Sequence, residues 1–275
     1  MALSKLVLGS IAVFSTLVLA APEGAPTPAR PAATAFTADL TGLWYNPLEN
    51  GWGVNIVQQY DVLFVTMFVY GPDNKPMWLF GSDVAFSAVD DLNGVIFTGD
   101  LYTATGSYYG VNFNPAQFGV TKVGTVTLRF GSYTTGTLSY TVNGVTVLKN
   151  IIPQTWKANV LAGNYLGAMS GATTCTLPLA QPNGLLKFNL GQSGSNATIQ
   201  VTDATGAQCT LTGTITAYGK LMDIDGSYSC TGSQSGTFGI RRLEAGVDGM
   251  FGIYYSFGSK CPTSGATMGA ALAGS

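Results

Sequence analysis

Short segments with the composition of β-strands, separated by turn signals, follow one another along most of the chain. Eight such segments lie between Leu40 and Trp156, and no stretch keeps a helical period for more than two turns. Asn143-Gly144 between two of them is typical of a two-residue hairpin, because a type I′ turn needs positive φ at both central residues. We therefore predict an all-β fold of antiparallel strands in a meander, closed as a barrel or folded as a sandwich.

A second series of strand-like segments, rich in Gly, Ser and Thr, begins after Leu161. It contains every cysteine of the chain: Cys175, Cys209, Cys230 and Cys261. A stretch of this length is sufficient for a domain of its own. We predict two antiparallel β domains, an N-terminal one over residues 39–158 and a C-terminal, disulfide-stapled one over residues 159–275.

The first residues have the pattern of a targeting signal. Lys5 precedes the apolar run 6–19, and small residues follow at Ala20. This run is short for a membrane span and fits a signal peptide over 1–20, cleaved next to Ala20. Residues 21–38 are rich in Pro and Ala without apolar periodicity, which is typical of a linker. The sequence thus predicts a secreted or periplasmic protein whose mature form has no transmembrane segment.

An even number of cysteines behind a signal peptide indicates two disulfides formed in an oxidising compartment. We predict the bridges Cys209–Cys230 and Cys175–Cys261. A hairpin turning at Tyr218–Lys220 places Cys209 opposite Cys230, within disulfide reach. A zinc site is the alternative, but no C-x-x-C pair is present.

The composition excludes several kinds of chemistry. The chain has no histidine, so a Ser-His-Asp triad, a Cys-His dyad and a histidine metal site are absent. Only 9% of residues are charged and the net charge is −2, so no basic patch indicates nucleic acid. We therefore predict no cofactor, no metal and no catalytic residue.

Carboxylates are the remaining groups with catalytic potential. Asp223 and Asp225 lie two apart on a predicted strand, so their side chains share one face roughly 7 Å apart. That separation suits an inverting glycosidase, but such enzymes place their two acids on either side of the scissile bond. A solvated strand end is the simpler interpretation. A carboxylate-dependent hydrolase of an extracellular polymer stays open as an alternative.

The segment 46–55, "NPLENGWGVN", is the most unusual stretch of the first domain. Exposed aromatic rings stack on sugars, whereas buried rings fill cores, and all four tryptophans lie in this domain. If a ligand binds, we expect it at this segment and at the hairpin that follows. The candidate ligand-binding residues are Trp44, Asn46, Glu49, Trp52, Asn55 and Trp78. The simpler interpretation is a tight bend, with Trp52 packed and Glu49 capping loop amides.

The run Val62–Tyr70 is apolar on both faces of its predicted strand. Antiparallel strands usually alternate between apolar and polar residues. We therefore expect the barrel interior to cover one face and the second domain or a partner to cover the other, so that oligomerisation through this strand is possible.

Two stretches resemble known families. Asn46, Pro47, Glu49 and Gly51–Gly53, followed by a hairpin with Asp73, Pro76 and Trp78, resemble the N-P-x-E-S-G-W-G motif of a group of secreted bacterial proteins. That group has no assigned activity, so the resemblance implies compartment and fold style only. "LTGLWYN" is similar to the first strand of avidin-like and lipocalin-like barrels.

Taken together, these features predict an exported, non-enzymatic binding or surface-interaction protein. Its partner would be an extracellular ligand such as a glycan or small molecule, or an envelope component. The alternatives are the hydrolase and an envelope structural protein. Convergent acids from different strands would favour the hydrolase, an aromatic-lined mouth would favour binding, and a broad exposed apolar sheet face would favour assembly.

Overall fold

The computed structural model describes residues 39–171, 184–232, 234–246, 248–257 and 265–273. The predicted signal peptide and the predicted linker, together with Cys175 and Cys261, lie outside the described residues. Cleavage of the signal peptide and the Cys175–Cys261 bridge therefore stay predictions. Within the described ranges, the structure contains no helix of the length and apolarity needed to span a membrane.

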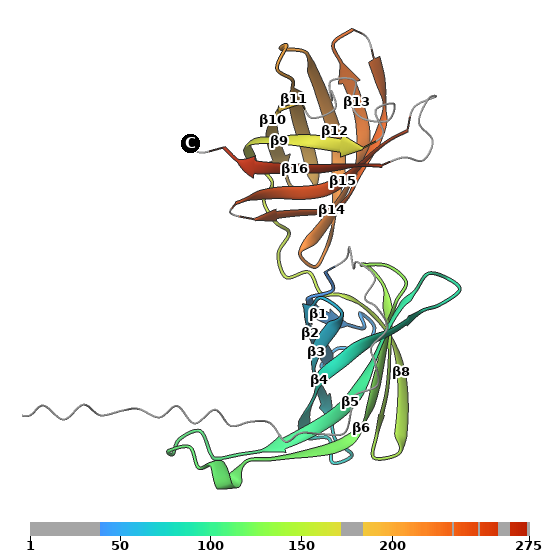
Figure 1. The fold of residues 1–275 in the computed structure, drawn as a ribbon, viewed down its shortest axis with the longest axis vertical. Coiled ribbons are helices and arrows are strands. Elements are labelled where there is room, and N and C mark those ends of the chain that lie inside the picture. The colour runs from blue at the N-terminus through green and yellow to red at the C-terminus, as the bar shows by residue number, and fades with distance from the viewer. Residues whose placement is uncertain (1–38, 172–183, 233, 247, 258–264, 274–275) are drawn as a thin grey trace, which may run out of the picture. The chain divides into compact units, whose positions relative to one another are not determined.

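Eight antiparallel strands form the first domain (Figure 1). They are β1 (Gly42–Tyr45), β2 (Gly53–Gln59), β3 (Val62–Tyr70), β4 (Pro76–Val89), β5 (Val95–Thr105), β6 (Gly119–Phe130), β7 (Gly136–Val142) and β8 (Val145–Pro153). Each strand pairs with the next, and β1 also pairs with β8, where Trp44 faces Pro153. The sheet is thus a closed barrel, which decides between the barrel and the sandwich.

The second domain is also a closed antiparallel barrel of eight strands. They are β9 (Gly163–Gly171), β10 (Leu186–Ser193), β11 (Asn196–Thr202), β12 (Gln208–Tyr218), β13 (Leu221–Cys230), β14 (Gln234–Gly246), β15 (Gly249–Phe257) and β16 (Gly265–Leu272). β9 lies between β10 and β16 and closes the barrel. The predicted fold class, two antiparallel β domains with a disulfide in the second, is confirmed.

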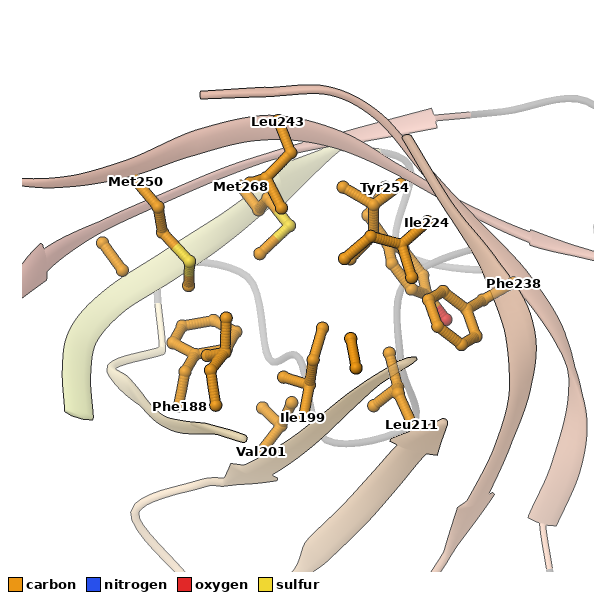
Figure 2. Close-up of a cluster of buried hydrophobic side chains, with 14 of the residues drawn as sticks. Phe188, Ile199, Val201, Leu211, Ile224, Phe238, Leu243, Met250, Tyr254 and Met268 are labelled. Carbon is orange, nitrogen blue, oxygen red and sulfur yellow. The ribbon is translucent and has the colours of Figure 1, made fainter. Parts of the chain in front are cut away.

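Alternation of side chains fills both barrels, because successive residues of a strand point to opposite faces. On β3, for example, Leu63, Val65, Met67 and Val69 are buried. The interior of the second barrel is lined by Phe188, Phe238, Met250, Met268 and their neighbours (Figure 2). Each domain therefore has its own hydrophobic core.

The two hairpins that the sequence predicted are present. Asn143 and Gly144 have φ of 49° and 83°, as a type I′ turn between β7 and β8 requires. Gly219 has a φ of 63° at the turn between β12 and β13. In the register that follows, Cys209 lies opposite Cys230 and the two form a disulfide with a Cα–Cα distance of 4.0 Å.

Replacement of both Cys209 and Cys230 by alanine is expected to destabilise the second barrel by about 3 kcal/mol, the chain entropy of closing a loop of this length. Urea unfolding of the double variant and the parent, followed by circular dichroism, measures this difference. An unchanged midpoint would show that the bridge does not constrain the unfolded chain.

Asp90 closes the turn between β4 and β5. Its Oδ1 accepts hydrogen bonds from the backbone N–H groups of Leu92 and Gly94, at 3.0 and 2.8 Å. Its Oδ2 pairs with the guanidinium of Arg129 on β6. The bond from Arg129, together with the two backbone bonds, lowers the pKa of Asp90 to about 2.

We expect Asp90→Asn to lower the melting temperature at pH 7, because the amide keeps the two turn bonds but loses the charge that pairs with Arg129. Because the pKa of Asp90 is lower in the folded protein than the value of 3.8 in the unfolded chain, the ionised carboxylate stabilises the folded state above pH 3.8. This stabilisation is lost as pH falls from 3.8 toward 2. The gap between variant and parent should therefore narrow between pH 4 and pH 2. Asp91→Asn at the neighbouring exposed position is the control and should show no such gap.

Candidate functional site

The segment 46–52 is a corner that connects β1 to β2. Asn46 organises it: its side-chain Oδ1 accepts a hydrogen bond from Leu48 N at 2.9 Å, and its backbone oxygen accepts one from Glu49 N at 3.0 Å. Asparagine favours such turns because its short side chain mimics a backbone acceptor. The corner is therefore held by local bonds and aims Glu49 back toward the barrel.

The Glu49 carboxylate joins the corner to β8. Its Oε2 accepts hydrogen bonds from Trp52 Nε1 at 3.0 Å and from Lys149 Nζ at 2.6 Å. The Lys149 ammonium also lies 5.9 Å from the centre of the Trp52 ring. The bond from Lys149 lowers the pKa of Glu49, and that from Trp52 adds to the effect. The donors to Glu49 are therefore the side chains of Trp52 and Lys149, whereas the sequence had suggested that Glu49 caps backbone amides of the loop.

Gly51 of the corner and Gly53, the first residue of β2, lie under rings of β3. Gly51 has a φ of +103°, and a Cβ there would lie 3.2 Å from the hydroxyl of Tyr70. A Cβ on Gly53 would lie 2.9 Å from a ring carbon of Phe68, closer than real side chains approach. The two glycines on either side of Trp52 therefore leave room for the rings of Tyr70 and Phe68 on the outer surface of the barrel.

We name the outward rings of β3, β4 and β5 the aromatic face. It consists of Phe64, Phe68, Tyr70, Trp78, Phe80 and Tyr102. The first four side chains are 42–54% exposed. The ring of Phe80 is central, with its centroid 5.7 Å from those of Trp78 and Tyr102 and 6.4 Å from that of Phe64. Phe64, Trp78, Phe80 and Tyr102 thus form one connected group of rings, and the exposed rings of Phe68 and Tyr70 lie on the same outer side of β3 as Phe64.

Polar side chains border these rings. Strand register aligns one outward row across five strands: Asn55, Thr66, Phe80, Tyr102 and Lys122. Lys122 Nζ lies 2.8 Å from Asp100, and the Tyr102 hydroxyl donates to the same carboxylate at 3.4 Å. The aromatic face therefore combines apolar ring surface with hydrogen-bonding groups at both edges.

The six candidate residues separate into three groups. Trp44 is buried in the core, where its Nε1 donates to the Leu40 oxygen at 2.9 Å. Asn46, Glu49 and Trp52 form the corner cluster described above. Asn55 and Trp78 lie on the outer surface with the aromatic face. The structure thus brings five of the six to the surface around one corner and leaves Trp44 inside.

Sequence reasoning missed most of the aromatic face, because it assigned the outer side of Val62–Tyr70 to a covered surface. Among the described residues, Phe64, Phe68 and Tyr70 remain exposed. The alternation of rings with buried aliphatic residues on β3 was the available signal. A partner that covers these rings stays a prediction.

The acidic pair of the second domain serves the barrel wall. Asp223 and Asp225 both face outward from β13 and both contact Arg241 of β14, with Asp225 Oδ1 2.5 Å from Nη2 and Asp223 Oδ2 3.8 Å from Nε. Asp223 also accepts a hydrogen bond from Arg242 N at 3.1 Å. Within the described part of the chain, no group of three or more potential metal ligands occurs.

The chain matches no protein-family model, and neither a curated protein nor a solved structure is significantly similar to it. The assignment of a function therefore rests on the geometry of its own residues.

Glu49→Gln is expected to lower the melting temperature at neutral pH, because it removes the charge that holds Lys149 while leaving an acceptor for Trp52. Because the pKa of Glu49 is lowered in the folded protein, the ionised carboxylate stabilises the folded state above pH 4.5, and this stabilisation is lost as pH falls below 4.5. The deficit should therefore shrink in acid. Thermal unfolding of the variant at pH 7 and in acid measures it.

Asp73→Asn is the control, since the Asp73–Lys75 pair is highly exposed and should contribute little. A Glu49→Gln variant of unchanged stability that loses ligand binding would instead make Glu49 a ligand contact.

Proposed function

We propose that the protein is an exported, non-enzymatic binding protein whose ligand-binding surface is the aromatic face of the first barrel. The observation that carries the proposal is the connected group of exposed rings around Phe80, since exposed aromatic clusters mark interaction sites. Export accords with the Cys209–Cys230 disulfide, which persists in oxidising compartments.

A glycan is the ligand class that suits this surface best. The C–H faces of sugar rings pack on aromatic side chains, and sugar hydroxyls need hydrogen-bonding partners beside them. Thr66 borders Phe80 on one side, with Asn55 next to Thr66 on β2, and the Asp100–Lys122 pair borders Tyr102 on the other. Polar groups in the same row as the rings are the feature that favours a hydroxyl-rich ligand here, whereas the exposed apolar sheet face by itself also suits assembly.

The hydrolase alternative gains no support from the carboxylates described. A general acid needs a raised pKa, whereas hydrogen bonds lower the pKa of Glu49, Asp90 and Asp203. Asp223 and Asp225 share one arginine. One observation supports the alternative of an envelope structural protein: the same exposed rings of β3 suit pairing with a second copy of the chain.

A glycan array tests the proposal, using the chain that begins at Ala21. Calorimetry then measures the affinity for the glycan that binds best. Trp78→Ala should weaken binding by at least about tenfold, or about 1.4 kcal/mol. Trp156→Ala is the matched control, because this exposed tryptophan follows β8 and lies outside the aromatic face. Both variants should keep the parent's melting temperature.

Two results would count against glycan binding through this face: no glycan retained by the folded parent, or equal affinities of Trp78→Ala and the parent. Sedimentation velocity over a range of concentrations separates the structural role. A dimer that Phe64→Ser dissociates would favour assembly.

A further inference from the structure

The hairpin between β5 and β6 ends in a tip, residues 106–118, that extends past the barrel wall (Figure 1). Pairing of β5 with β4 stops at Tyr102, and pairing of β6 with β7 stops at Gly124. The two strands nevertheless stay paired with each other as far as Thr105 and Gly119. The tip therefore has no neighbouring strand on either side.

Large apolar side chains of the tip and its base face solvent. They are Tyr108, Tyr109, Val111, Phe113, Phe118 and Val120. The exposed fraction is 94% for Tyr109 and 71% for Phe113. No charged residue occurs anywhere in 101–121. So much uncharged apolar surface on a projecting hairpin indicates a contact with something apolar.

Ser107 and Asn114 organise the tip through hydrogen bonds that stay within it. The Ser107 hydroxyl accepts from Asn114 N at 2.7 Å and lies 3.2 Å from the Asn114 oxygen, to which it donates. Asn114 Oδ1 in turn accepts from Ala116 N at 3.1 Å at the start of the short 3₁₀ helix η1 (Pro115–Gln117). These internal bonds let the tip enter an apolar environment without leaving those groups unpaired.

Charges near this end of the barrel cancel in pairs. The corner 46–52, the β3–β4 turn, the β7–β8 turn and the hairpin tip share this end, because consecutive strands are antiparallel. The charged side chains along them form the pairs Glu49–Lys149, Asp73–Lys75 and Asp100–Lys122. This end therefore suits an electrically neutral surface better than an anionic one.

We propose that the hairpin tip inserts into the interfacial region of a lipid bilayer with zwitterionic headgroups. Tyrosine is enriched at that depth, where its ring meets acyl chains and its hydroxyl reaches the headgroups, and phenylalanine adds apolar area to the contact. Binding of this kind depends on buried apolar area, and a neutral tip needs no anionic lipid. The tip is distinct from the aromatic face, so this membrane contact is additional to ligand binding.

Co-sedimentation with phosphatidylcholine vesicles tests the proposal, using the chain that begins at Ala21 because the apolar run 6–19 would itself bind lipid. Phe113→Ser/Phe118→Ser should reduce vesicle partitioning by roughly tenfold or more, since two large apolar side chains are removed. Binding of the parent should persist between about 0.1 M and about 0.5 M NaCl, because no ion pair with lipid is involved.

Leu92→Ser is the matched control. Leu92 is 80% exposed at the opposite end of the same barrel, in the turn between β4 and β5, and its loss should leave partitioning unchanged. Circular dichroism and melting temperature verify that each variant is folded. Trp78→Ala should bind vesicles like the parent, which keeps this test separate from that of glycan binding.

Three results would overturn the proposal: a folded parent that does not sediment with neutral vesicles, a double variant that sediments as well as the parent, or binding that needs anionic lipid and disappears at high salt. A protein cross-linked through the tip in the absence of any vesicle binding would likewise assign the tip to a protein partner.

Discussion

Pairing of β1 with β8 closes the first sheet, and the outer surface of the domain depends on that closure. A closed sheet has one interior, so only every second residue of each strand can be buried in it. The residues between them must face outward. On β3, β4 and β5 those outward residues include aromatic rings, and they form the aromatic face because register places Phe80 beside Trp78 and Tyr102.

The corner 46–52 supports this arrangement from the end of the barrel. The Glu49 carboxylate binds both Trp52 and Lys149 of β8, so the corner also stabilises the end of the barrel where β8 pairs with β1. Gly51 of the corner and Gly53 of β2 leave space for the rings of Tyr70 and Phe68 on the outer surface. The corner thus supports the rings beside it, and it is itself exposed to solvent, with Leu48 91% exposed.

The first barrel offers two different surfaces at and near one end. The aromatic face has polar groups within the same row as its rings, whereas the hairpin tip carries no charge and pairs Ser107 and Asn114 with each other and with its own backbone. The former suits a hydroxyl-rich ligand and the latter an apolar medium. Contact with a membrane through the tip would keep the aromatic face beside that membrane, because both lie at or near the same end of the barrel.

The sequence by itself determined the all-β class, most strands, the Asn143-Gly144 hairpin and the Cys209–Cys230 pair, because these follow from local turn chemistry and alternation. It did not reveal β9 and β16, whose small residues lack an apolar alternation. A Cβ on Gly167 would lie 2.1 Å from the oxygen of Gly269, so at this position the two strands leave no room for a side chain.

The location of the candidate residues was likewise decided only in three dimensions. Trp44 and Trp52 lie eight positions apart in similar glycine-containing segments, yet one is buried in the core and the other binds Glu49 at the barrel end. Whether the outward rings of Val62–Tyr70 were covered depended on contacts with residues distant in sequence. Alternation predicts which side chains share a face of a strand, but only the closed tertiary structure decides which face is inside and what lies beside the other.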